Sequence, residues 1–340
     1  MKITIVGAGA IGGTIGAFTT QAGHDVTLVD IVPEHVRIMQ SRGLRITGIR
    51  GDHVYPVRAK LANDLTEPLE HVFLCVKGHF TEAAMEQIAP LLAPDGYVVS
   101  IQNGLNEEII ARFVGRERTV GCFVHFGADY LEPGLIQLGQ EQTIHLGELD
   151  GTVTPRLEQL REVLSAVMPA AITTNIWGYL WGKLVYAAMA FAVSTVDAPV
   201  PAVLNDPRGR RVSLAASSEA ARVGQTQGYR LEHIGGFDPN AFLPGPSWQT
   251  AANAEFDKLA AEMAVSIKQH MGIWRDLRVK RRTTEVDVQC GPIVERGLEY
   301  DVATPVNAAI IQLIHEIEGG EREMTWDNLD ALLVSVPSEV

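Results

Sequence analysis

Short apolar runs alternate with helix-like segments through the first half of the chain. The runs at 2–6, 25–29, 71–76, 97–101 and 119–124 are rich in Val and Ile and predict strands. A further strand is expected at 143–146, added antiparallel after a turn at Pro133-Gly134. Strands that alternate with helices are typical of a mostly parallel sheet with helices on both faces.

The second half changes to long, alanine-rich segments with helical spacing. Helices are predicted over 155–167, which closes the sheet domain, and then over 177–194, 207–226, 247–270, 284–298 and 304–317. Asp206, Ser247 and Thr304 stand where capping side chains are expected. We therefore predict an α/β fold: an N-terminal Rossmann-type doubly wound sheet over residues 1–174, then an all-helical C-terminal domain over residues 175–325.

A glycine-punctuated turn follows the first predicted strand and opens a helix. Gly7 allows the tight turn, Gly9 lets bare backbone approach a pyrophosphate, and Gly12 lets the helix pack closely on the strand. Together with Ala10 and Ile11, these residues are predicted to bind the phosphates of a dinucleotide at the helix N-terminus. The alternative is a glycine-rich turn in an ordinary strand-helix unit.

The second predicted strand ends in Asp30, where dinucleotide-binding folds place the carboxylate that holds the adenosine ribose. A carboxylate accepts hydrogen bonds from a free 2'-hydroxyl and repels a 2'-phosphate, so Asp30 favours NAD(H). Arg37 or His35 in the following helix could neutralise such a phosphate, which leaves NADP(H) open. Asp30 as a helix cap or turn residue is the structural alternative.

The composition of the chain excludes several classes of binding partner. A net charge of −13 and a pI near 5.2, without a basic stripe, argue against nucleic acid or an anionic membrane as partner and leave a small-molecule substrate. Three isolated cysteines without metal-ligand spacing predict no metal site and a reducing compartment. Glycines interrupt the apolar N-terminus, so we expect no signal peptide and a cytoplasmic protein. The alanine-rich helices allow a homodimer.

Four residues are candidates for the chemistry. Lys77 and Asn103 follow predicted strands, whose carboxyl ends form the ligand edge of a doubly wound sheet, so both are predicted to bind the cofactor, with Asn103 placed to touch the nicotinamide ribose or the substrate. A simple turn at Asn103-Gly104 is the alternative. Lys183 is the only cation between 177 and 200, and it either extends to solvent or lies in a cleft. Glu285 is expected in the first turn of a helix capped by Thr284. A carboxylate at this position often has no role beyond a favourable interaction with the helix dipole.

Taken together, these motifs resemble the ketopantoate reductase (2-dehydropantoate 2-reductase) family over nearly the whole chain. The matching stretches are Gly7-Ala-Gly-Ala-Ile-Gly-Gly13, Cys75-Val-Lys77, Gln102-Asn-Gly-Leu105, Pro133-Gly134, Trp181-x-Lys183, Asp276 with Thr284-Glu285-Val-Asp287, and Thr304-Pro-Val-Asn307. The resemblance implies an NAD(P)H-dependent reductase of a 2-oxo acid. It implies that Lys183 protonates the alkoxide, that Glu285 binds a substrate hydroxyl and tunes the lysine, and that Asn103 holds the lysine or the substrate. Lys77 matches a lysine near the cofactor.

The chain also departs from the family pattern. Asparagines common one and two turns after the lysine are replaced by Ala187 and Phe191, and a serine is replaced by Gly272. These changes predict a larger or more apolar pocket than one fitted to ketopantoate. The second hypothesis for an enzyme is therefore an NAD-dependent dehydrogenase that oxidises a more apolar hydroxy compound. A hypothesis from another class of protein is a dinucleotide sensor without catalysis, which would not need Lys183, Asn103 and Glu285. A methyltransferase matches no motif beyond the glycines.

Overall fold

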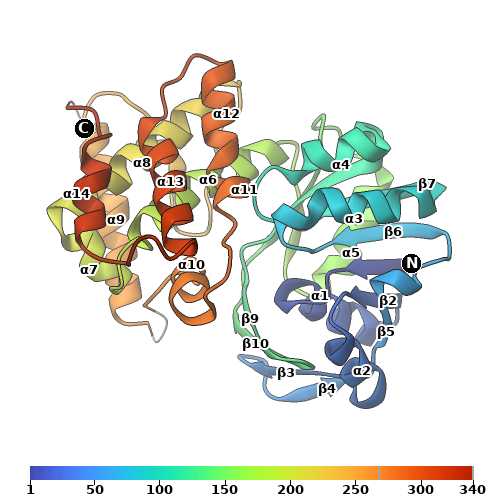
Figure 1. The fold of residues 1–340 in the computed structure, drawn as a ribbon. Helices are drawn as coiled ribbons and strands as arrows, with labels where there is room; N and C mark the ends of the chain where they lie inside the picture. The colour runs from blue at the N-terminus through green and yellow to red at the C-terminus, as the bar shows by residue number, and fades with distance from the viewer. Residues whose placement is uncertain (267–268, 339–340) are drawn as a thin grey trace. The chain divides into compact units, whose positions relative to one another are not determined.

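The computed structural model describes residues 1–266 and 269–338 and divides the chain into two compact units, Met1–Ile176 and Trp177–Val340 (Figure 1). Unit 1 contains the strands, and unit 2 is built from helices. Each unit is described by itself.

An eight-stranded sheet forms the centre of unit 1, in the order β12-β11-β8-β7-β6-β1-β2-β5. Its strands are β1 (Lys2–Val6), β2 (Asp25–Asp30), β5 (Arg58–Leu61), β6 (Leu69–Leu74), β7 (Leu92–Ser100), β8 (Thr119–Phe123), β11 (Ile144–Glu148) and β12 (Ala170–Ile172). Neighbouring strands are parallel except for the antiparallel pair β8 and β11. This arrangement confirms the predicted doubly wound sheet.

Helices cover both faces of this sheet, because its strands carry apolar side chains in both directions. On β6, for example, Phe73 joins one core while Val72 and Leu74 join the other. The first core includes residues of α1 (Ala10–Gln21), α2 (Pro33–Arg42) and α5 (Pro155–Ser165), and the second those of α3 (Thr81–Ile88) and α4 (Asn106–Val114). The 3-10 turns of this unit are η1 (Ala62–Asp64), η2 (Gly78–Phe80), η3 (Ala89–Leu91) and η4 (Arg116–Arg118).

Unit 1 also contains a second sheet that the sequence analysis did not predict. Its order is β4-β3-β10-β9, with β3 (Leu44–Gly48), β4 (His53–Tyr55), β9 (Gly127–Glu132) and β10 (Leu135–Gln140). The turn at Pro133-Gly134 joins β9 to β10, and the strand expected at 143–146 follows as β11, which pairs antiparallel with β8 as predicted. The β9 segment has no alternation of buried and exposed residues, and β10 pairs with the distant β3, which local pattern cannot show.

Unit 2 is all helical, as predicted. Its elements are α6 (Ile176–Val193), α7 (Val200–Asn205), α8 (Pro207–Thr226), η5 (Pro239–Phe242), α9 (Trp248–Ala264), α10 (Gly272–Arg275), the π-helical η6 (Asp276–Lys280), α11 (Val286–Gln289), α12 (Gly291–Glu299), α13 (Pro305–Glu318) and α14 (Asp327–Leu333). By length and composition α6 could span a membrane, but 83% of it is buried within the protein. That is the environment of the core helix of a soluble protein.

Several helix limits differ from the expected ones. The helix expected over 247–270 ends at Ala264, and that expected over 284–298 is divided at Cys290 into α11 and α12. Asp206 does cap α8 by accepting from the Arg208 backbone N–H. Ser247 and Thr304 make no capping bond, and Ser247 has a positive φ of 61°.

Glu219 of α8 replaces Thr304 as the cap of α13. Its carboxylate accepts from the backbone N–H groups of Val306 and Asn307, both at 2.9 Å, and from Asn307 Nδ2 at 2.7 Å. Glu219 is only 4% exposed, and burial raises its pKa to about 7, although these hydrogen bonds oppose the shift. The anion therefore carries a desolvation cost at neutral pH.

We expect this carboxylate to make unit 2 less stable as pH rises. The folded pKa lies above the unfolded value, so the folded state binds more protons and stability falls between about pH 4.5 and about pH 7. The shift corresponds to at most about 3 kcal/mol. Urea unfolding midpoints of the wild type and Glu219→Gln across this window test this. The variant should lose the slope, and equal slopes would contradict the assignment.

Candidate active site

The predicted cofactor residues of unit 1 lie along one edge of the large sheet. Asn103 follows β7, Lys77 follows β6, the glycine turn follows β1 and Asp30 ends β2. These four strands are consecutive neighbours in the order β7-β6-β1-β2, and all are parallel. Because the carboxyl ends of parallel strands meet at one edge, the structure brings these residues into a row.

The glycine turn has the geometry that a dinucleotide pyrophosphate requires. Gly7 has a φ of +95°, and a Cβ there would lie 2.7 Å from the Val76 backbone nitrogen. A Cβ on Gly12 would collide with the Gly7 carbonyl oxygen. A Cβ on Gly9, in contrast, would meet nothing within 4 Å, so the turn is closed on two sides and open at Gly9. Helix α1 begins at Ala10 with no side-chain cap, which suits a phosphate at its N-terminus.

Asp30 is half-buried and helps to hold this turn. Its Oδ2 accepts from the Ala8 backbone N–H at 2.9 Å, and its Oδ1 accepts from the Val32 N–H at 3.0 Å. Each carboxylate oxygen has a second lone pair, so Asp30 can still accept from ribose hydroxyls.

His35 belongs to the interior of unit 1. The side chain is fully buried, with Nδ1 accepting from the Gly134 backbone N–H at 2.9 Å and Nε2 at 2.9 Å from the Ala8 carbonyl oxygen. This partner set fixes the neutral tautomer with the proton on Nε2. The expectation that His35 could turn toward a 2'-phosphate was therefore wrong. The same imidazole ties the glycine turn to the turn between β9 and β10.

The surroundings of Asp30 are acidic. Tyr130 of β9 stacks edge-on against His35 with ring centroids 5.0 Å apart. Burial, reinforced by the negative charges of Asp30 and Glu34, raises the pKa of Tyr130 to about 12. The same charges disfavour a further anion here. Arg37, the other cation considered, is exposed and lies 4.0 Å from Glu34.

Lys183 and Glu285 lie in unit 2 on different elements. Lys183 is the one charged residue of α6 and is half-buried, whereas the residues on either side of it are buried. Glu285 precedes the first turn of α11 as its N-cap residue, so its expected place inside that turn was off by one position. Thr284 does take a capping role, because its Oγ1 accepts from the Val286 N–H at 3.3 Å.

Two family models match the chain. The ketopantoate reductase PanE/ApbA model covers residues 3–151, and the ketopantoate reductase PanE/ApbA C-terminal model covers residues 175–318. The chain belongs to the ketopantoate reductase family. This membership confirms the predicted fold class and the predicted enzyme class, an oxidoreductase that acts on CH–OH groups with a nicotinamide dinucleotide.

Relatives and solved structures align with more than nine-tenths of the chain. The 2-dehydropantoate 2-reductase of Archaeoglobus fulgidus is 28% identical, over 94% of this chain and 98% of its own. That of Mesorhizobium japonicum is 29% identical, over 93% and 98%. A structure of D-mandelate dehydrogenase with NADH and anilino(oxo)acetate matches the fold with a TM-score of 0.80 at 24% identity, over 94% of this chain and 99% of that chain.

The departures from the ketopantoate reductase pattern leave few polar groups on the Lys183 helix. Ala187 and Phe191 are buried, and Phe191 is fully enclosed. The other half-buried residues of α6 are Tyr179 and Tyr186, which lie four residues before and three after Lys183 and so share its face. The Tyr186 hydroxyl donates to Met271 Sδ at 3.7 Å. Gly272 starts α10, where a Cβ would meet nothing.

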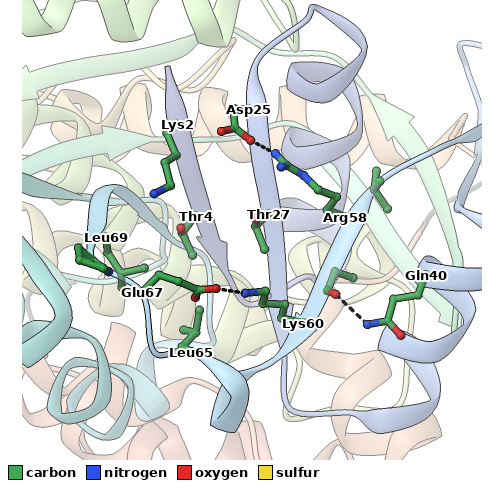
Figure 2. A pocket seen from close by; sticks show the side chains of 13 residues that line it. Lys2, Thr4, Asp25, Thr27, Gln40, Arg58, Lys60, Leu65, Glu67 and Leu69 are labelled. Atoms are coloured by element: carbon green, nitrogen blue, oxygen red, sulfur yellow. Dashed lines mark hydrogen bonds and ion pairs between the residues drawn. The ribbon is translucent and has the colours of Figure 1, made fainter.

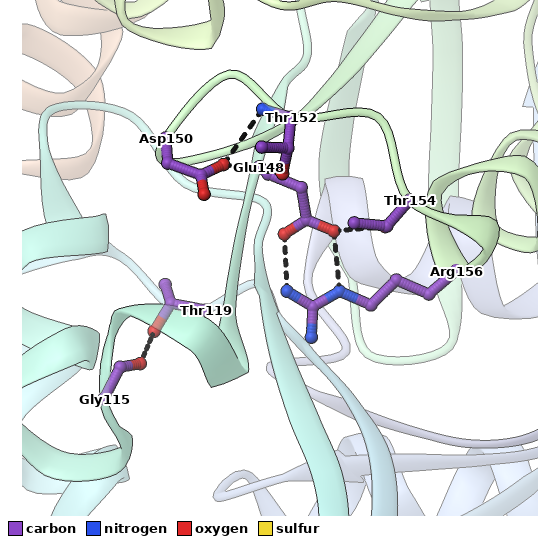
Figure 3. Close-up of polar contacts among 7 residues, drawn as sticks. All are labelled: Gly115, Thr119, Glu148, Asp150, Thr152, Thr154 and Arg156. Atoms are coloured by element: carbon purple, nitrogen blue, oxygen red, sulfur yellow. Dashed lines mark hydrogen bonds and ion pairs between the residues drawn. The ribbon is translucent and has the colours of Figure 1, made fainter.

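Two surface cavities of unit 1 lie away from this edge. One, of about 460 Å³, reaches from the amino ends of β1 and β2, and its cations face carboxylates, as in the pairs Arg58–Asp25 and Lys60–Glu67 (Figure 2). The other, of about 620 Å³, lies beside Glu148, which accepts from Arg156 and Thr154 (Figure 3). Neither cavity is lined by the glycine turn, Asp30, Lys77 or Asn103, so neither is the predicted cofactor site.

The sequence pointed to the polar cluster from Gln102 to Asn106 after β7, but it missed Thr81, which is buried beside Gln102 and Asn106. Only the polar type of Thr81 could have drawn attention to it. Gly104 has a φ of +89°, so the turn expected at Asn103-Gly104 is also present. Within residues 1–266 and 269–338, no group of three or more His, Cys, Asp or Glu side chains is arranged to hold a metal ion.

Proposed function

We propose that the protein reduces a 2-oxo acid to a 2-hydroxy acid with a reduced nicotinamide dinucleotide, with Lys183 as general acid. The observation that carries this proposal is the pairing of two features in a ketopantoate reductase family chain. Unit 1 has a glycine turn open at Gly9, and unit 2 has one half-buried lysine, Lys183, on an otherwise uncharged helix. The 2-dehydropantoate 2-reductase relatives support the reaction class.

Each residue has a defined part in this mechanism. When bound, the reduced nicotinamide supplies the hydride. Lys183 donates a hydrogen bond and then a proton to the carbonyl oxygen, where negative charge grows only in the transition state. Glu285 tunes the lysine, and it binds the side-chain hydroxyl of a substrate that carries one, as ketopantoate does. Asn103 lies at the nicotinamide ribose and orients the lysine or the substrate, and Lys77 lies beside the cofactor.

We further propose NADH as the preferred cofactor. Asp30 and Glu34 form an acidic environment around Tyr130, and His35 is held inside the unit by two hydrogen bonds. No basic residue lies between Asp30 and Arg37 except this engaged imidazole. A 2'-phosphate would therefore meet repulsion without compensation.

The substrate is proposed to be small, and a specific observation favours one with an apolar side chain over ketopantoate. Tyr179 and Tyr186 flank Lys183 on its own face of α6, and the Tyr186 hydroxyl is directed to the Met271 thioether. Buried Ala187 and Phe191 offer no hydrogen bond. A site with so few hydrogen-bonding groups gives little preference to a substrate that carries a hydroxyl, and it accommodates a substrate with a large apolar side chain. We also propose that the protein is cytoplasmic and forms a homodimer.

The test is NADH and NADPH oxidation with ketopantoate and with 2-oxo acids of aliphatic or aromatic side chain. We expect kcat/KM to be at least about tenfold higher with NADH, since one uncompensated charge repulsion is worth about 1.4 kcal/mol or more. Asp30→Asn keeps an acceptor oxygen but removes the charge, and should narrow this preference. NADPH preference in the wild type would refute the cofactor proposal, and no turnover of any 2-oxo acid would refute the function.

A further inference from the structure

A chain of four hydrogen bonds joins the loop after β6 to the loop after β7. Gln102 Nε2 donates to the Val76 carbonyl oxygen at 2.9 Å and to Thr81 Oγ1 at 2.8 Å. Thr81 Oγ1 donates in turn to Asn106 Oδ1 at 2.7 Å. Asn106 Nδ2 then donates to the Asn103 carbonyl oxygen at 2.5 Å. Donors and acceptors alternate consistently along the whole chain.

Thr81 is the centre of this chain, because one hydroxyl serves as acceptor for Gln102 and donor to Asn106. Thr81 is fully buried, Asn106 is 1% exposed and Gln102 is 5% exposed. Water therefore cannot easily replace a lost partner. Removal of the hydroxyl takes the donor from Asn106 Oδ1 and the acceptor from one N–H of Gln102, whose other N–H keeps its bond to Val76. Buried networks of this kind fix one arrangement of the backbone that they join.

The two loops carry residues assigned to the cofactor by the proposed function. Lys77 directly follows Val76, whose carbonyl is held at one end of the chain, and Asn103 supplies the carbonyl at the other end. Strands β6 and β7 are hydrogen-bonded neighbours, so the loops leave the sheet side by side. Any movement of one loop relative to the other would shift Lys77 relative to Asn103.

We propose that Thr81 is a positioning residue: its hydroxyl locks the loops after β6 and β7 together, so that Lys77 and Asn103 meet the nicotinamide cofactor in one fixed arrangement. This inference rests on the proposed function for the roles of those two residues. The benefit is preorganisation, because loops that are already ordered lose less entropy on binding.

The first experiment compares NADH dissociation constants, measured by fluorescence titration, for Thr81→Val, Thr81→Ser and the wild type. Valine keeps the shape and removes the hydroxyl, and we expect about a tenfold weaker affinity together with a lower kcat. Serine keeps the hydroxyl and should restore both. Thr119→Val is the matched control, since the Thr119 hydroxyl is equally buried but donates to the Gly115 carbonyl at the opposite edge of the sheet (Figure 3). It should leave affinity unchanged.

A second measurement shows whether Thr81 acts through Asn103. In an Asn103→Ala background, Thr81→Val should weaken binding much less than in the wild type, because coupled residues are not additive. Wild-type affinity in Thr81→Val, or an equal loss in Thr119→Val, would overturn the inference. These affinities need no turnover, so they stand apart from the proposed function, which fails if the wild type binds NADH and reduces no 2-oxo acid.

Discussion

Lys183→Met is expected to lower kcat for 2-oxo acid reduction by about 10²- to 10⁴-fold, the range typical of a lost general acid. Methionine keeps the length of the side chain and its packing on α6 but supplies neither a proton nor a positive charge. The developing alkoxide would then lose its main stabilisation. NADH affinity should change little, because the glycine turn and Asp30 belong to unit 1. Steady-state kinetics with a separate NADH titration measures both quantities.

Lys258→Met provides the matched control in the same unit. Lys258 lies on α9, where its ammonium donates to the Gly236 carbonyl oxygen at an exposed position. The control should retain wild-type kcat and KM. Turnover of Lys183→Met within tenfold of the wild type would remove Lys183 from the general-acid role.

Two glycine substitutions in the same turn should have different effects: Gly9→Ala should weaken NADH binding, and Gly12→Ala should lower the stability of the fold. Gly9→Ala should fold with stability within about 0.5 kcal/mol of the wild type, because its Cβ meets nothing within 4 Å and its φ of −66° lies outside the left-handed region that favours glycine. Its NADH affinity should fall at least about tenfold, since the methyl group occupies the space into which the pyrophosphate comes. Gly12→Ala should lose stability by about 1–3 kcal/mol or more, because its Cβ strikes the Gly7 carbonyl oxygen.

Thermal or urea unfolding and NADH titration of the two variants separate these effects. A Gly9→Ala protein that binds NADH as the wild type does would place the pyrophosphate elsewhere. A Gly12→Ala protein of unchanged stability would mean that α1 moves away from β1 at little cost.

Local sequence was enough for features whose partners are near in the chain. Strands β1, β2, β6, β7 and β8 were predicted because their apolar runs are continuous, whereas the short edge strands β5 and β12 were missed. The glycine turn was predicted because Gly7, Gly9 and Gly12 act within one strand-turn-helix unit. The limits of α8 match the prediction because Asp206 and Pro207 mark its start locally.

Features that depend on distant partners were not predictable. Strand β10 pairs with β3, which lies about ninety residues earlier in the chain. Strand β9 lacks the alternation of buried and exposed residues by which a strand is predicted. Glu219 caps a helix that begins eighty-six residues later, which displaced Thr304 from its expected role. Thr81 likewise gains its importance only when β6 and β7 become neighbours. The parts assigned to Lys183, Glu285 and Asn103 remain predictions.

The doubly engaged imidazole of His35 has a practical consequence for redesign of coenzyme preference. A graft that replaces the segment after Asp30 with a basic loop from an NADPH enzyme would also replace His35. The Ala8 carbonyl and the Gly134 amide would then lose their shared partner in the interior. Such a chimera should express poorly or denature early, whereas single basic substitutions at Ile31 or Val32, both exposed, leave the imidazole in place. The safer route to an altered coenzyme therefore edits those two solvent-facing positions and keeps the histidine.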